Sequence, residues 1–207
     1  MMVIPADLPP QLAPLAWMLG TWKGWGMLAT PDDEDDRAVI EEVHADIVGT
    51  RMRMVTTVRA AQVPADGGID PMLDAAGALA RLTPGEVERE ETLYVRVLPG
   101  SGHLPAPGEY EPRELTATGA DLEGLAVLWV GVGIGPRVQL TSDTLAREAH
   151  VGPVQNLARM YGLVAGEMMW TQERTLEGEE ATVDISGRLM RTAHATTASG
   201  EEVHADE

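Results

Sequence analysis

The sequence contains no cysteine in its 207 residues. Without thiols the chain cannot form disulfides, iron–sulfur sites, Cys-ligated zinc or a thiol nucleophile, and it suits a reducing compartment such as the cytoplasm. Phenylalanine is also absent, whereas 11 methionines are present. Because methionine is flexible and fills irregular space, part of the core is expected to be loosely specified.

Positive charge is scarce as well. Fifteen Lys and Arg face 33 Asp and Glu, for a net charge of −18. Such a field repels phosphate backbones and anionic lipid surfaces, so we expect neither nucleic acid nor membrane as a partner. No run of about 18 apolar residues occurs. Residues 1–20 lack a basic segment and hold four prolines, which is atypical of a signal peptide.

Apolar residues recur mainly with a period of two. In residues 51–59, Met52, Met54 and Val58 share one face and the arginines share the other, as in a half-buried strand. About ten such segments at short spacing predict an all-β fold, a ten-stranded antiparallel β-barrel whose closure removes unpaired edges. The other expected strands are residues 20–26, 37–48, 91–98, 113–118, 123–132, 136–148, 157–164, 167–176 and 181–191.

Three other segments complete the predicted organisation. Residues 10–19 can form a short helix ended by Gly20. Residues 63–90 are rich in Gly, Pro and Ala and are interpreted as an insertion with a small helix at 71–82. The barrel domain is expected to span residues 1–191, and residues 192–207 are small and polar, as in a disordered tail.

The stretch GTWKGWG (residues 20–26) places three glycines around two tryptophans. A phosphate-binding glycine loop needs a strand before it and a helix after it, and here the order is reversed. Gly20, Gly24 and Gly26 instead suit the coiling and close backbone approach found at barrel corners. Trp22 is expected to plug one end of the barrel, with its indole N–H bonded to a partner.

The same stretch carries a family resemblance. LAPLAWMLGTWKGWG resembles the nitrobindin family, whose members have GxWxGxG after a short helix, and residues 136–143 and 157–170 are also similar. The resemblance implies a ten-stranded barrel related in shape to fatty-acid-binding proteins and lipocalins. It also implies ferric haem b, the isomerisation of peroxynitrite to nitrate, and binding of nitric oxide.

The last strand departs from the family pattern. Haem-binding members place a histidine there, in a segment similar to LQPHLSARLKR, whereas this chain has ATVDISGRLMR and Asp184 at the corresponding position. Aspartate is not among the usual axial ligands of haem. Three roles stay open for Asp184: a solvated carboxylate or one paired with Arg188, a hydrogen-bonding group at a cavity mouth, or a direct iron ligand.

No other residue offers itself as a replacement by its sequence position. None of the histidines pairs with another at metal-ligand spacing, and no metal site is predicted. Glu41 and Glu42 are adjacent and point to opposite faces of a strand, so they cannot act as an acid–base couple. No catalytic residue is therefore assigned. The candidates considered as substitute haem ligands were His44, His103, His150, His194, His204, Met54, Met168 and Met169.

Two main hypotheses follow. In the first, the chain is a nitrobindin-like barrel without haem that is not an enzyme and holds a small apolar ligand in its mouth, with Arg188 near that mouth. In the alternative, it is a haem b peroxynitrite isomerase with another axial ligand. Carriage of a fatty acid is a third hypothesis and requires a basic residue in the cavity, for which Arg96 and Arg188 are the candidates.

Overall fold

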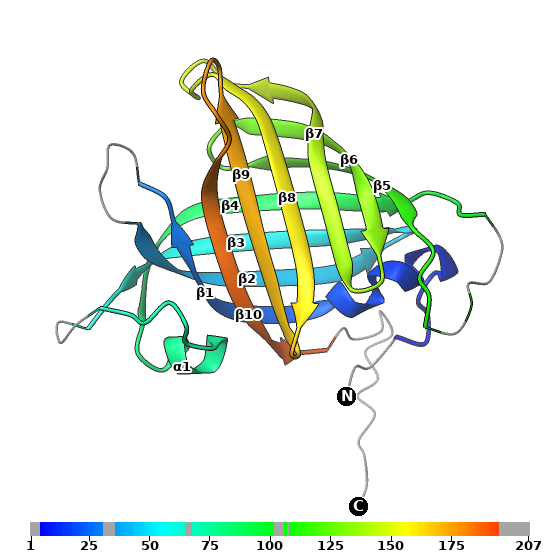
Figure 1. Cartoon of the computed structure of the whole chain (residues 1–207), viewed down its shortest axis with the longest axis horizontal. Helices are drawn as coiled ribbons and strands as arrows, with labels where there is room; N and C mark the ends of the chain where they lie inside the picture. The colour runs from blue at the N-terminus through cyan, green and yellow to red at the C-terminus, as the bar shows by residue number, and fades with distance from the viewer. Residues whose placement is uncertain (1–4, 31–35, 65–67, 102–105, 107, 195–207) are drawn as a thin grey trace, which may run out of the picture.

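Ten antiparallel strands close into one barrel in the computed structural model, which describes residues 5–30, 36–64, 68–101, 106 and 108–194 (Figure 1). Each strand pairs with its neighbours in sequence, and the first also pairs with the last. The strands are β1 (Gly20–Leu28), β2 (Arg37–Val48), β3 (Arg51–Gln62), β4 (Thr83–Val97), β5 (Arg113–Asp121), β6 (Leu125–Ile134), β7 (Arg137–Arg147), β8 (Val154–Val164), β9 (Glu167–Leu176) and β10 (Thr182–Ala193). The predicted ten-stranded barrel is confirmed.

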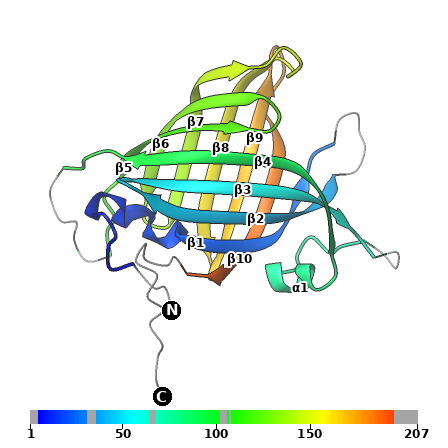
Figure 2. The ribbon, with the colours of Figure 1, turned by 180° about the vertical axis from the view of Figure 1, so that it is seen from behind.

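Alternation along the strands builds the core. On β3, Met52, Met54, Thr56 and Val58 are buried inside, and the residues between them are more exposed. The same period-two pattern recurs around the barrel, so one continuous apolar cluster fills its interior. The β1–β10 pair closes the sheet into a barrel (Figure 2). The β7–β8 pairing is the shortest, since β7 pairs with β8 only over Arg137–Thr141.

A 3₁₀-helix, η1 (Pro10–Met18), covers one end of the barrel just before β1. Its Leu12 and Leu15 are buried, and a proline within it disfavours a regular α-helix. Trp22 is fully buried beside it and donates its indole N–H to the Met18 carbonyl at 2.8 Å. The guanidinium of Arg191 lies 4.0 Å from the centre of the Trp22 ring.

The segment between β3 and β4 is shorter than the predicted insertion of residues 63–90. β3 continues to Gln62 and β4 already begins at Thr83, so the last part of that range is strand, not insertion. The predicted small helix is present as α1 (Ala75–Leu79), shorter than the expected 71–82. It packs on the outside of the barrel against Trp25 and its neighbours on β1 and β2.

Two further expectations concern the ends of the molecule. β10 extends to Ala193, so the first residues of the expected tail belong to the barrel, and residues 195–207 lie outside the described part of the chain. Within the described residues, no helix has the length and apolar character needed to cross a bilayer.

Candidate functional site

Asp184 lies inside the barrel, although its neighbours on the same predicted face point outward. The β9–β10 pairing shifts register between Val183 and Ile185, which leaves Asp184 at a β-bulge. As a result Asp184 and Ile185 are both buried, whereas Ser186 and Arg188 lie outside. The expectation that Asp184 is solvated or paired with Arg188 is wrong, because the bulge breaks the alternation on which it rested.

The carboxylate of Asp184 is fully engaged by side chains from β4 and β9. Arg89 binds it in a bidentate pair, with N–O distances of 2.8 and 3.2 Å. The amide of Gln172 donates to it at 2.8 Å, and a guanidinium nitrogen of Arg174 lies 3.5 Å away. Burial by itself would raise the pKa of this carboxyl, but the hydrogen bonds and charge of Arg89 outweigh it and lower the pKa.

Polar contacts continue from this pair deeper into the barrel. Arg159 is buried; its Nε donates to the Gln172 amide oxygen at 3.0 Å, and one Nη donates to Glu91 at 2.6 Å. Its guanidinium also lies 4.8 Å from the centre of the Trp129 ring. Burial disfavours the cationic form, but the nearby Glu91 charge raises the pKa of Arg159 above its usual range.

Little space is left between these side chains toward the centre of the barrel. The cavity that Arg89, Arg159 and Gln172 line holds about 50 Å³. Ligand sites for drug-sized molecules and cofactors usually measure about 300–1,000 Å³. The interior on the Arg159 side of the ion-pair network is therefore filled by side chains. On its other side, Asp184 and Arg89 border a second cavity of about 420 Å³.

A second carboxylate, Glu41 on β2, is buried in the same interior with no measurable exposure. Its Oε2 accepts the indole N–H of Trp170 at 2.7 Å, and its Oε1 has no hydrogen-bond partner in the part of the chain that the structure describes. Gly26 and Gly187 are paired across β1 and β10, and a Cβ at either would collide with the Glu41 carboxylate. Burial raises the pKa of Glu41 to about 8, with the Trp170 hydrogen bond opposing the rise.

The glycines of the GTWKGWG stretch thus have identifiable neighbours. A Cβ at Gly24 would collide with the backbone of Arg188 on β10, and Gly26 makes room for Glu41 as well as for β10. Gly20 begins β1 with a φ of 111°, a conformation that side chains disfavour. These glycines permit close approach of the strands and leave room for a buried carboxyl. They lie within strand β1 and do not form a phosphate-binding loop.

Comparisons with known proteins agree with this architecture. The chain matches the THAP4-like, heme-binding beta-barrel domain over residues 11–191. It belongs to this family. Ferric nitrobindin-like proteins from Beutenbergia cavernae and Kineococcus radiotolerans are 32% and 33% identical to it, over 92% and 90% of this chain and 98% and 96% of their own lengths.

Two further relatives extend the comparison. A peroxynitrite isomerase from Pseudarthrobacter chlorophenolicus is 28% identical, over 85% of this chain and 90% of its own length. The crystal structure of Rv2717c from M. tuberculosis has 23% identity and a TM-score of 0.63, and the match covers 90% of this chain and 99% of that chain. This likeness shows that the fold is shared.

The residues around Asp184 do not suit the haem that gives the family its description. The Asp184 carboxylate already has three partners, and it differs from the His, Cys, Met and Tyr side chains that usually bind haem iron. Tyr161, the tyrosine nearest the network, holds its hydroxyl against Arg159 at 3.2 Å. The interior cavity beside Arg159 and Gln172, of about 50 Å³, is also too small for a porphyrin.

The described histidines lie away from this interior. His44 is exposed on β2 and hydrogen-bonds to Thr21 at 3.1 Å, and His150 is exposed next to Glu148. His194 is exposed just after β10, whereas His103 and His204 fall outside the described residues. In the described ranges, no group of three or more His, Cys, Asp or Glu side chains is arranged to hold a metal ion.

The remaining candidates also occupy definite places. Met54 and Met168 are buried in the main core, whereas Met169 is 41% exposed on the outer face of β9. Arg96 is exposed on β4. Arg188 lines a cavity on the outside of the barrel and not its interior. Sequence reasoning did not find Arg89, Arg159 or Glu41 as interior groups, because period-two patterning marks opposite faces without saying which one is enclosed.

Proposed function

We propose that this chain is a haem-independent member of the family, a small-molecule-binding barrel that is not a peroxynitrite isomerase. The observation that supports this proposal is the bidentate Arg89–Asp184 pair, which fills the interior at the position that the resemblance assigns to the haem histidine. A paired, buried carboxylate would have to lose Arg89 before it could approach iron, and breaking a buried ion pair costs about 3–5 kcal/mol.

The replacement of the haem-binding histidine by Asp184 is not the only obstacle to haem binding, because Arg89 lies beside it. Even with an imidazole at position 184, the guanidiniums of Arg89 and Arg174 would remain in the space beside it. A positive environment disfavours ferric iron, and the bulk of the arginine side chains excludes the porphyrin. Restoring haem binding therefore requires removal of Arg89 together with replacement of Asp184.

The test is titration of the purified chain with haemin, followed by absorbance in the Soret region and by gel filtration. We expect no stoichiometric complex for the wild type, little change for Asp184→His, and a saturable Soret shift for Arg89→Ala/Asp184→His. Val183→His is the matched control, because Val183 is half exposed on the same strand and points outside.

A red-brown wild-type protein whose haem survives gel filtration, at one haem per chain, would refute the proposal. Loss of that band on substitution of a single His, Met or Tyr would then identify the ligand and favour the peroxynitrite isomerase alternative. An equal response of Val183→His and the double variant would show that the added histidine binds haem without the barrel interior.

A further inference from the structure

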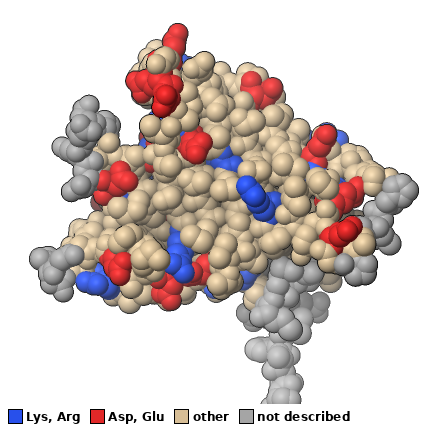
Figure 3. Space-filling view, in the orientation of Figure 1, with Lys and Arg blue, Asp and Glu red and all other residues tan. Residues whose placement is uncertain are grey.

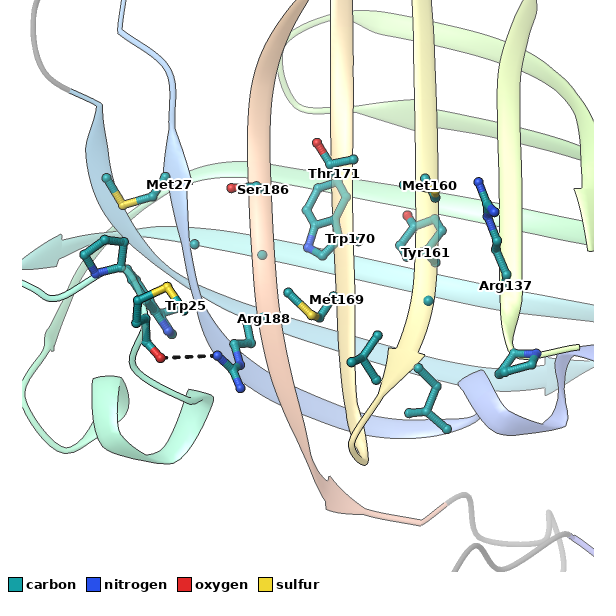
Figure 4. A pocket seen from close by; sticks show the side chains of 18 residues that line it. Trp25, Met27, Arg137, Met160, Tyr161, Met169, Trp170, Thr171, Ser186 and Arg188 are labelled. Carbon is teal, nitrogen blue, oxygen red and sulfur yellow. Dashed lines mark hydrogen bonds between the residues drawn. The ribbon is translucent and has the colours of Figure 1, made fainter.

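A large groove of about 820 Å³ lies on the outer face of the barrel, over β8, β9, β10 and β1 (Figure 4). The space-filling view shows a broad uncharged surface on this face that is interrupted by a few basic groups, with most acidic groups toward its margins (Figure 3). The volume falls within the usual range of about 300–1,000 Å³ for small-molecule sites. Its apolar side chains include Met27, Met72, Met160, Leu163, Val164 and Met169.

The strand register accounts for the floor of the groove. Arg137, Gly162, Met169, Arg188 and Trp25 face one another in turn across β7, β8, β9, β10 and β1, and all five line the groove. Gly162 has no side chain, and a Cβ built there would meet only a backbone oxygen at 3.9 Å. The floor is therefore low at Gly162 and apolar at Met169.

The wall of the groove comes from the segment that precedes α1. Pro71 and Met72 line this side, and Met72 is 79% exposed. Arg188 donates to the Met72 carbonyl at 3.4 Å and pairs through Nε with Glu167 at 2.5 Å. The other oxygen of Glu167 accepts the backbone N–H of Ala75 at 2.9 Å, which fixes the start of α1. These contacts hold the wall in place before any ligand arrives.

Charge distinguishes the two ends of the groove. Arg188 is neutralised by Glu167, whereas Arg137 is exposed and forms no ion pair with any residue that the structure describes. The backbone positions of Arg137 and Arg188 lie three strand spacings apart, a span of roughly 14 Å. In a chain with a net charge of −18, Arg137 is thus an uncompensated cation at one end of an apolar trough.

We propose that this groove binds one amphipathic anion, with its apolar body over Gly162 and Met169 and its anionic head at Arg137. An apolar surface with a single cation at its end matches that chemistry, and methionine side chains adapt to varied apolar shapes. The groove lies outside the barrel, so the proposal does not depend on whether the interior binds haem.

The experiment uses two probes that share an aromatic body: anionic 8-anilinonaphthalene-1-sulfonate and neutral N-phenyl-1-naphthylamine. Fluorescence titration of the full chain should show one saturable sulfonate site. Arg137→Gln should weaken binding of the sulfonate about 10-fold and leave the neutral probe unchanged. Gly162→Leu should remove both probes by filling the floor, where space exists for a side chain.

Matched controls separate the groove from general surface effects. Gly152→Leu adds the same side chain at a glycine with open space around it, and Arg96→Gln removes an exposed charge on β4. Both controls should bind the probes as the wild type does. Circular dichroism and thermal unfolding confirm that each variant is folded.

Three results would overturn the proposal. The first is absence of saturable binding to the wild type, and the second is equal loss of both probes in Arg137→Gln. The third is a dimer in sedimentation that Gly162→Leu dissociates, since a second copy of the chain would then cover the groove.

Discussion

The buried carboxyl of Glu41 makes the stability of the folded barrel depend on pH. In the folded barrel its carboxyl has a pKa of about 8, raised by burial from an ordinary value of 4.5. Among the described residues, Trp170 alone donates a hydrogen bond to it. In the unfolded chain the same group ionises near 4.5. Between these values the folded state binds more protons, so stability falls as pH rises.

The perturbation is Glu41→Gln, which keeps an oxygen for Trp170 and removes the titration. Each pKa unit corresponds to about 1.4 kcal/mol. From pH 5 to pH 8, the free energy of unfolding of the wild type should therefore fall relative to the variant by about 3.5 kcal/mol. The difference between the two free energies of unfolding cancels the contributions of all other carboxyls. Its change with pH also removes any pH-independent cost of the amide.

Urea unfolding at several pH values between 5 and 8 measures this difference. Glu42→Gln is the matched control, because Glu42 is the adjacent residue on the outer face, with its carboxylate exposed near Lys23. The control should track the wild type across the range. A Glu41→Gln difference that stays constant within about 1 kcal/mol would refute the reasoning, since the carboxyl would then ionise normally or be hydrated.

Further predictions concern the other interior contacts, each checked by urea unfolding. Arg89→Met should lower stability at pH 7 by about 3 kcal/mol, because Asp184 loses its bidentate partner and keeps only Gln172 and the more distant Arg174. If the losses of Arg89→Met and Asp184→Asn simply added in the double variant, the two residues would not be coupled and this reasoning would be wrong. Because folding lowers the pKa of Asp184 from its ordinary value of 3.8, its ionised carboxylate stabilises the fold at pH values above 3.8. This contribution to stability is lost as the pH falls through the folded-state pKa. Asp184→Asn should therefore reduce the acid sensitivity of stability, and an unchanged acid limb would count against it. Gly187→Ala should cost about 3 kcal/mol by collision with Glu41, and less in a Glu41→Ala background; equal costs would exclude that contact. Trp22→Ala should lower stability by about 4 kcal/mol, and a loss below 1 would show that the indole is not a packed plug.

Much of the fold could be predicted because the relevant signals are local. Alternating apolar residues such as Met52, Met54 and Val58 identify a strand without knowledge of its partners. The short helix before Gly20 follows from its leucine spacing and from the glycine that ends it. The start of β4 was not predicted, because β4 begins at Thr83 within a segment whose composition is typical of a loop.

The interior charges could not be predicted for physical reasons. Asp184 reverses its side through a β-bulge, which depends on how β9 and β10 align and leaves no signature in residues 181–191. Its partner Arg89 is 95 residues away in sequence, and only barrel closure brings β4 close to β10 in the interior. Glu41 was correctly placed on the face opposite Glu42, but alternation does not tell which face is enclosed.

The amino-acid sequence by itself determined the strands, their alternation, the glycine–tryptophan stretch and the presence of an acid at position 184. The tertiary structure alone decided that this acid meets Arg89 inside the barrel and that the larger cavity lies outside it. Local patterning is encoded within a few residues, whereas contacts between distant charges arise only when strand register and closure place them in one enclosed volume.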